Sequence, residues 1–287
     1  MNSTKNMAKH IRRVLLFSIS ITFLVSCSIS PTYPRKEIEK VIKNMCEDEF
    51  NIDVNVWDVG DTVWIYAPLK IINEDGQWNI TKDGRWNEDI SKNTRIIHSS
   101  LNRIFLNIDK PPKFYCFVMS DIEKIGIDWY TIVFIPDIVR YTIESYTTGH
   151  VSTEKMNERT FSSPSENPQA LGDKVGEHIQ KYDITMGEFI SYLVKQSMER
   201  KFTAPEVKDN FQVNDLRAYY LNGKLGIIFD IMIKEYKEGL PEPFEEAKKA
   251  VKKFLKIYDS SGDIVEIEIF DTFNKKRRFY SRGALFE

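Results

Sequence analysis

Apolar residues recur at helical spacing in four stretches of the chain. The corresponding helices are expected over about residues 35–49, over about residues 90–107, from Thr185 onwards and after Pro243. Thr185 and Glu188 form a capping box, which is typical of a helix start. Each stretch places its apolar residues on one helix face and predicts that this face is buried. The expected core residues are Ile38, Val41, Ile42 and Met45; Ile97, Leu101, Ile104, Phe105 and Ile108; Phe189, Leu193 and Val194; and Phe244, Ala247, Val251, Phe254 and Leu255.

Two strand-like runs follow each predicted helix, so the order α-β-β-α-β-β occurs twice. Asn222-Gly223 joins one pair of runs and is typical of a tight hairpin turn. We therefore expect an α+β fold of two halves, 35–148 and 185–287, each with an antiparallel sheet and two helices on one face. Moving the last strand of a half to its front gives βαββαβ, which predicts a permuted ferredoxin-like topology. The expected strands span 53–59, 62–69, 113–119, 128–135, 216–221, 224–233, 264–270 and 277–285.

Residues 149–184 are expected to be a linker or loop insertion between the halves, with a loop at 161–168. A short amphipathic helix is expected just before it, at 137–146. The runs 115–119 and 129–135 are apolar on both faces, which is typical of strands covered on both sides. Because the predicted helices cover one face, something else must cover the other. The second half of the chain is the default, and another subunit or a ligand is the alternative.

The first 26 residues are expected to be an export signal. Residues 1–13 are basic, and the apolar stretch Val14–Leu24 spans only about 16 Å as a helix, too short for a bilayer core of about 30 Å. The stretch ends in Leu24-Val25-Ser26-Cys27, which resembles the lipobox of bacterial lipoproteins: a branched apolar residue and a small residue precede the cysteine. The resemblance implies cleavage before Cys27 and attachment of acyl chains such as palmitate to it. The alternative is an ordinary signal peptide with an incidental cysteine.

The lipobox resemblance also implies a location in the cell envelope. Ser28 follows the cysteine where lipoproteins retained in an inner membrane often carry Asp, so an outer-membrane protein that faces the periplasm is expected. Residues 27–34 would then be a lipidated tether, and its last seven residues reach at most ~25 Å. The membrane is therefore the first expected partner, through the lipid anchor.

Cys46 and Cys116 are the remaining cysteines of the mature chain. A disulfide between them would close a loop of about 70 residues and stabilise the fold by about 4 kcal/mol. The favoured alternative is two buried free thiols, because both residues have apolar neighbours.

Two sequence features offer possible ligand contacts. Asp-Gly-x-Trp occurs twice, ending at Trp78 and at Trp86, and two hairpin tips explain it best. A tryptophan pair stacked on sugar rings and a calcium loop are the alternatives, although the spacing does not match an EF-hand. The basic run Lys275–Arg278 is expected to be a solvated turn, with contact to anionic headgroups or lipopolysaccharide phosphates as the alternative.

Catalytic motifs are missing from the sequence. The chain has no Gly-x-Ser-x-Gly, P-loop or Cys-x-x-Cys pattern, and neither His98, His150 nor His178 lies in a zinc-protease motif. We therefore expect no enzyme activity, no metal and no cofactor. Residues 1–26 hold four basic and no acidic residues, so the mature chain keeps 36 basic and 42 acidic residues, a net charge of −6. An acidic body argues against nucleic-acid binding.

The leading hypothesis is a membrane-anchored envelope lipoprotein that acts as a non-catalytic scaffold or partner-binding module, with another envelope protein as its partner. The first alternative is a periplasmic binding protein for a lipid, a glycan or another small ligand. The second alternative is an enzyme that acts on the cell envelope. A deep cavity would favour a binding protein, a flat exposed apolar sheet face would favour a scaffold, and carboxylates and histidines converging in a cleft would favour an enzyme.

Overall fold

The computed structural model describes residues 32–69, 88–123, 126–148, 153–258 and 262–287. The expected signal peptide, the lipidation site Cys27, His150 and the tryptophans Trp78 and Trp86 lie outside the described residues.

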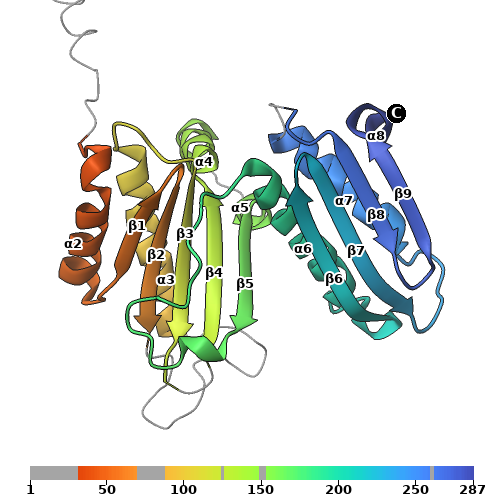
Figure 1. Cartoon of the computed structure of the whole chain (residues 1–287), viewed down its shortest axis with the longest axis horizontal. Coiled ribbons are helices and arrows are strands. Elements are labelled where there is room, and N and C mark those ends of the chain that lie inside the picture. Colours follow the sequence, from red (N-terminus) through yellow and green to blue (C-terminus); the bar gives the residue numbers. More distant parts are fainter. Residues whose placement is uncertain (1–31, 70–87, 124–125, 149–152, 259–261) are drawn as a thin grey trace, which may run out of the picture.

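The described residues form two mixed α+β halves that follow one another along the chain (Figure 1). The first half comprises η1 (Arg35–Glu37), α2 (Ile38–Phe50), β1 (Asn55–Val59), β2 (Thr62–Leu69), α3 (Glu88–Leu106), β3 (Phe114–Asp121), β4 (Ile127–Phe134), α4 (Ile135–Thr148), α5 (Thr153–Glu158) and β5 (Thr160–Glu166). The second comprises α6 (Met186–Thr203), η3 (Lys208–Asn210), β6 (Phe211–Leu221), β7 (Lys224–Ile233), α7 (Pro243–Tyr258), β8 (Glu266–Asp271), β9 (Lys276–Ser281) and α8 (Arg282–Phe286), and η2 (Pro168–Ala170) lies between the halves.

The predicted order α-β-β-α-β-β is confirmed in both halves. The strands form two sheets, in the orders β1-β2-β3-β4-β5 and β6-β7-β8-β9. Neighbouring strands are antiparallel except β2–β3 and β7–β8, which are parallel and are each joined by a crossover helix. The permuted ferredoxin-like topology is not confirmed, because strands joined by a helix are split by another strand in that arrangement and are direct neighbours here.

Local sequence signals start and end several of these elements. Thr185 accepts a hydrogen bond from the Glu188 backbone, and the Glu188 side chain bonds back to Thr185, so the predicted capping box begins α6. Asn222 and Gly223 have φ of 50° and 81°, which is the left-handed backbone that a two-residue hairpin turn requires.

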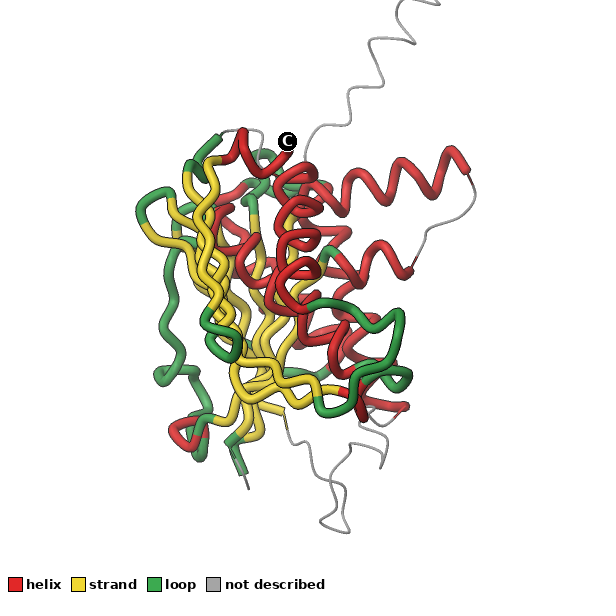
Figure 2. Tube along the Cα trace, turned by 90° about the vertical axis from the view of Figure 1, so that its right-hand side faces the viewer, coloured by secondary structure: helices red, strands yellow, loops and turns green. Residues whose placement is uncertain are grey.

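A layer of helices covers one face of the first sheet (Figure 2). Side chains of β2 and β3 alternate between the two faces, so Ile65 and Phe117 join Ile42 of α2 and Leu101 of α3 in a core on the helical side. The predicted core residues of α2 and α3 lie in this core, with Val41 at its edge.

The opposite face of the first sheet is covered by residues 167–184, here called the crossing segment, and by the start of α6 (Figure 1). Trp64 Nε1 donates to the carbonyl of Tyr182 at 2.8 Å, and the Tyr66 hydroxyl donates to the carbonyl of Asp173 at 2.5 Å. Gly176 has φ of 74°, and a Cβ there would lie 2.8 Å from the Tyr66 ring, so only glycine fits. The cover is therefore intramolecular, as expected by default.

The two cysteines lie on opposite faces of the first sheet. Cys46 packs in the helical-side core, whereas Cys116 of β3 points into the core beneath the crossing segment. Both thiols are free and buried, and burial raises the pKa of Cys46 to about 11. The sheet between them rules out the disulfide considered from the sequence.

The prediction of a loop at 161–168 is wrong, because β5 spans most of these residues and forms the edge of the first sheet. Proline cannot donate to a sheet ladder, so Pro164 is tolerated at an edge. Gln196 of α6 completes this edge: its side chain accepts from the Ser162 backbone at 2.7 Å and donates to the Thr160 carbonyl at 2.9 Å.

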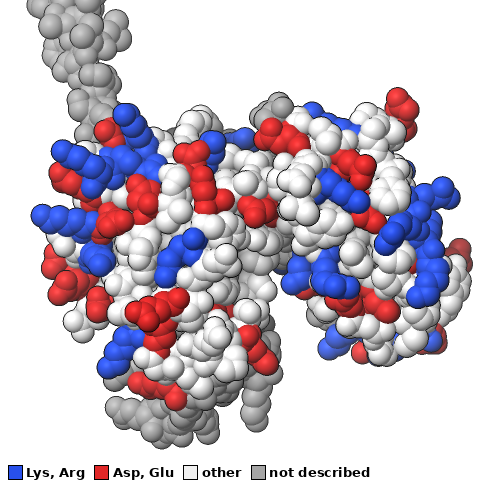
Figure 3. All heavy atoms as spheres, viewed as in Figure 1, with Lys and Arg blue, Asp and Glu red and all other residues white. Residues whose placement is uncertain are grey.

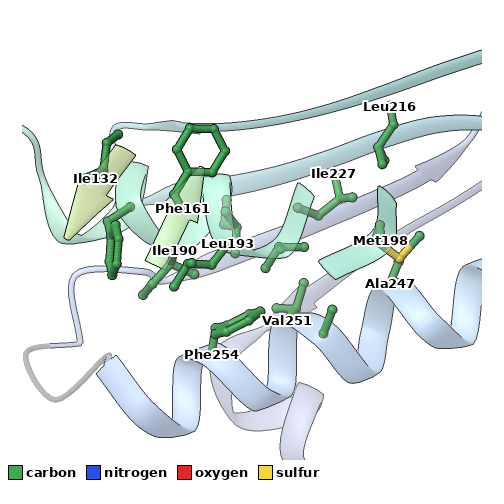
Figure 4. Close-up of a cluster of buried hydrophobic side chains, with 14 of the residues drawn as sticks. Ile132, Phe161, Ile190, Leu193, Met198, Leu216, Ile227, Ala247, Val251 and Phe254 are labelled. Atoms are coloured by element: carbon green, nitrogen blue, oxygen red, sulfur yellow. The ribbon is translucent and has the colours of Figure 1, made fainter. Parts of the chain in front are cut away.

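The two halves share one core, which a close-up shows around α6 (Figure 4). Ile132 and Phe161 of the first sheet, Leu193 of α6 and Phe254 of α7 belong to the same buried cluster. The ring of Phe189 in α6 lies 5.2 Å from Phe114, 6.2 Å from Phe134 and 5.5 Å from Tyr258, measured between ring centroids. The halves are therefore expected to unfold together.

Candidate functional site

A pocket of about 660 Å³ lies on the helical side of the first sheet, with α3 on one side and α4 on the other. We call it the α3–α4 pocket. Cavities of roughly 300–1,000 Å³ with apolar walls and a few polar groups are the usual receptors of small molecules. The lining residues are His98, Ser99, Asn102, Arg103, Leu106 and Asn107 of α3 and its end; Tyr115, Thr131 and Val133 of the sheet; Ile138, Tyr141, Thr142 and Ser145 of α4; and Met156 and Thr160.

Three lining residues form a hydrogen-bonded chain at the α3 wall. The Tyr115 hydroxyl donates to Asn102 Oδ1 at 3.2 Å, and His98 Nδ1 lies 2.9 Å from the same hydroxyl oxygen. Because the Tyr115 hydroxyl donates its proton to the hydrogen bond with Asn102, His98 must donate to the hydroxyl oxygen through Nδ1. The other ring nitrogen, Nε2, is then the acceptor. Burial lowers the pKa of His98 to about 4, so the imidazole is neutral at pH 7. The wall therefore offers polar atoms without a charge.

The position of α4 is fixed by contacts with α5, with Arg159 and with α7. The Tyr141 hydroxyl donates to the carbonyl of Lys155 at 2.9 Å, which ties α4 to α5. Asp137 at the start of α4 accepts from the Tyr258 hydroxyl of α7 at 2.5 Å and pairs with Arg159 at 3.3 Å. The α4 wall of the pocket is thus held by the second half as well as by the first sheet.

A second cluster of polar side chains lies beneath the crossing segment. His178 Nδ1 lies 2.5 Å from Asp173 Oδ2, and His178 Nε2 lies 3.0 Å from Asp128 Oδ1. An ionised carboxylate only accepts, so both bonds form together only when both ring nitrogens carry a proton. Asp128 also accepts from Ser120 Oγ and, at 3.0 Å, from Asn167 Nδ2.

This cluster holds the crossing segment against the sheet. The Ser120 hydroxyl donates to the Asp128 carboxylate, and both side chains are fully buried, so the hydroxyl is not accessible to a substrate. Both nitrogens of His178 are occupied by carboxylates, and the His178 and Asp128 side chains are 3% and 0% exposed. The carboxylates and histidine do converge, and Asp173 and His178 border a shallow open pocket, but both ring nitrogens of His178 already face carboxylates.

Acid should weaken this cluster through Asp173. Burial raises the pKa of Asp173, but hydrogen bonds from His178, Val175 and Gly176 outweigh burial and lower the pKa to about 2. Because this lies below the ordinary 3.8, the stabilisation is complete above about pH 4 and is lost as the pH falls towards 2. Asp173→Asn is expected to lower the free energy of unfolding at pH 7 by roughly 2 kcal/mol and to flatten its dependence below pH 4. Urea titrations at pH 7, 4 and 3 measure both effects. An equal dependence of the unfolding free energy on pH in the unmodified chain and in Asp173→Asn would contradict the assignment.

The sequence pointed to other residues as candidate sites. Cys27, Trp78 and Trp86 lie outside the described residues. The sequence places neither His98 nor His178 in a zinc-protease motif. The four-residue spacing of His98 to Asn102 nevertheless places both on one helix face. Asp128, which contacts His178 in the structure, is 50 residues away in the chain, and no local sequence pattern predicts that contact.

The basic run forms the start of the outermost strand of the second sheet. Lys275 occupies the turn with φ of 55°, and Lys276, Arg277 and Arg278 are exposed along β9, where Figure 3 shows basic side chains gathered. Charged residues on an exposed edge strand oppose pairing with another sheet. This favours the structural explanation of the run.

In the part of the chain that the structure describes, no helix is both long and apolar enough to span a membrane. Nor does any group of three or more His, Cys, Asp or Glu residues within those described ranges have the geometry to hold a metal ion. Comparison with known proteins gives no match to any family model, curated protein or solved structure.

Proposed function

We propose that the protein is a non-catalytic binding module, lipidated at Cys27 and held in the cell envelope facing the periplasm, and that the α3–α4 pocket receives a small ligand. The observation that supports this function is the pocket itself: about 660 Å³ between two helices, with a hydrogen-bonded chain of His98, Tyr115 and Asn102 at one wall.

The pocket supports ligand binding better than a scaffold role. The scaffold hypothesis depended on an uncovered apolar face of the first sheet, and that face is buried by the crossing segment and α6. An enzyme is less well supported, because both ring nitrogens of His178 already face carboxylates and one of these, Asp128, is fully buried. The envelope location depends on the lipobox resemblance alone.

Filling the pocket should abolish binding of a small uncharged probe. Thr142 lines the α4 wall and is partly exposed, so Thr142→Trp adds bulk to the pocket without entering the core. With 4-fluorobenzamide as the probe and the lipidated chain in nanodiscs, we expect ¹⁹F line broadening for the unmodified protein. Thr142→Trp should weaken binding at least tenfold, because the ring occupies the space that the probe needs.

Thr147→Trp is the matched control, since Thr147 lies on the same helix, is exposed and does not line the pocket. It should broaden the probe signal as the unmodified chain does. Equal loss in both variants, or no broadening above empty nanodiscs, would contradict a ligand site between α3 and α4.

The proposed anchor has its own test. Cys27→Ser removes the only thiol of the lipobox, so it should abolish incorporation of a radiolabelled or alkyne-tagged palmitate and release the chain from the membrane fraction. Cys46→Ser is the control and should keep the label, because this thiol is buried in the core. A labelled Cys27→Ser chain would refute the lipoprotein proposal, whatever the pocket binds.

A further inference from the structure

The walls of the α3–α4 pocket are almost free of charge. None of its described lining residues is Asp or Glu, and Arg103 is the single cationic side chain among them. Arg103 is 68% exposed at the rim, and its guanidinium lies 3.6 Å from Glu49 Oε1. A charged ligand would lose its hydration without gaining a buried counter-charge, which costs far more than placing an uncharged one there. The pocket therefore selects against acids and amines.

The hydrogen-bonding groups of the pocket are arranged in two pairs. Ser99 and Asn102 lie three residues apart on α3, and Thr142 and Ser145 lie three residues apart on α4, so each pair shares one helix face. Four of these polar groups form no hydrogen bond with another described side chain or backbone group: the hydroxyls of Ser99, Thr142 and Ser145 and the amide nitrogen of Asn102. Four polar groups on two opposing helices are thus available to a ligand.

Apolar side chains also line the pocket. Val133 comes from the sheet, Ile138 from α4, Leu106 from α3 and Met156 from α5, and the Tyr141 ring adds an aromatic face. A fitting ligand therefore combines an apolar face with hydroxyl and amide groups around its rim. A pyranose ring has C–H faces and a rim of hydroxyls, and an N-acetyl substituent adds an amide and a methyl group.

We propose, building on the ligand-binding function above, that the α3–α4 pocket binds an uncharged N-acetylated sugar of about disaccharide size. Asn102 pairs with the acetamido group, and Thr142 and Ser145 bind ring hydroxyls from the opposite wall.

The test titrates N,N′-diacetylchitobiose against the lipidated chain in nanodiscs, by isothermal calorimetry and saturation-transfer NMR. Thr142→Val keeps the shape of the side chain and removes its hydroxyl, so it should weaken the sugar about fivefold, as expected for one lost hydrogen bond, and leave 4-fluorobenzamide binding unchanged. Asn102→Leu should weaken the sugar at least tenfold, because it removes the amide nitrogen that binds the acetamido group and leaves the buried Tyr115 hydroxyl without its acceptor. Thr147→Val is the control and should change nothing.

The outcomes separate this inference from the function on which it rests. Binding of 4-fluorobenzamide without binding of chitobiose would overturn the sugar and leave a ligand-binding pocket. Decanoate that binds more tightly than chitobiose and competes with 4-fluorobenzamide would overturn the uncharged class in the same way. Absence of binding by all three probes would overturn both proposals. If Asn102→Leu fails to fold, the Thr142→Val and Thr147→Val pair still decides the result.

Discussion

Replacement of His178 by alanine is expected to lower the free energy of unfolding by about 3–5 kcal/mol, because it leaves buried carboxylates without their shared partner. The imidazole lies between Asp128 and Asp173 and is 3% exposed. Its loss removes two charge-assisted hydrogen bonds and releases the crossing segment from the start of β4. Urea unfolding at pH 7 measures the effect, and hydrogen exchange should show faster exchange in residues 173–184 than in α2.

Glu177→Ala is the matched control for this prediction, because Glu177 is the exposed neighbour of His178 in the same loop. It should change the free energy of unfolding by no more than ~0.5 kcal/mol. A cost below about 1 kcal/mol for His178→Ala would mean that the two carboxylates are satisfied without it, and the role assigned to the cluster would be wrong.

Phe189→Ala should destabilise both halves together, by about 3–5 kcal/mol. Phe189 is fully buried, and its ring meets Phe114 and Phe134 of the first sheet and Tyr258 of α7. All five tryptophans lie before residue 185, so tryptophan fluorescence reports on the first half although Phe189 belongs to the second. The urea midpoint by fluorescence should fall as far as the midpoint by circular dichroism.

Phe273→Ala serves as the control, since this side chain is 47% exposed at the β8–β9 turn. Its midpoint should stay close to that of the unmodified chain. If Phe189→Ala lowers the urea midpoint by circular dichroism but not the midpoint by fluorescence, the halves unfold independently, and the shared core does not couple them.

The parts of the fold that the sequence predicted correctly are those governed by local signals. The capping box at Thr185, the stripe of apolar residues that begins at Phe244, and the Asn222-Gly223 turn each involve residues close in the chain. Such signals were enough for the order of helices and strands in both halves.

The parts that the sequence did not predict depend on distant residues. Residues 160–166 resemble a loop, and they form a strand because β4 pairs with one side and Gln196 of α6 binds the other. The parallel pairing of β2 with β3 likewise depends on the packing of α3, which no pattern within either strand encodes. The crossing segment is polar enough to resemble a linker, although Trp64 and Tyr66 hold it against the sheet.

The candidate site was harder to predict than the fold. Its α3 wall depends on Asn102 and Tyr115, which lie in different elements and meet only when α3 packs on β3. The α4 wall depends on Asp137, which is held by Tyr258 from the second half, 121 residues away. A pocket that forms between several helices and strands has no contiguous sequence pattern. The sequence therefore identified single lining residues but not the pocket.

If the proposed function holds, the α3–α4 pocket is occupied by a small molecule in the cell. The most direct measurement places the photoreactive residue p-benzoylphenylalanine at position 142, irradiates the cells that make the protein, and analyses the purified chain by mass spectrometry. We predict an adduct of discrete mass at position 142, absent when the same residue stands at position 147. Equal labelling at both positions, or none at position 142, would contradict the claim.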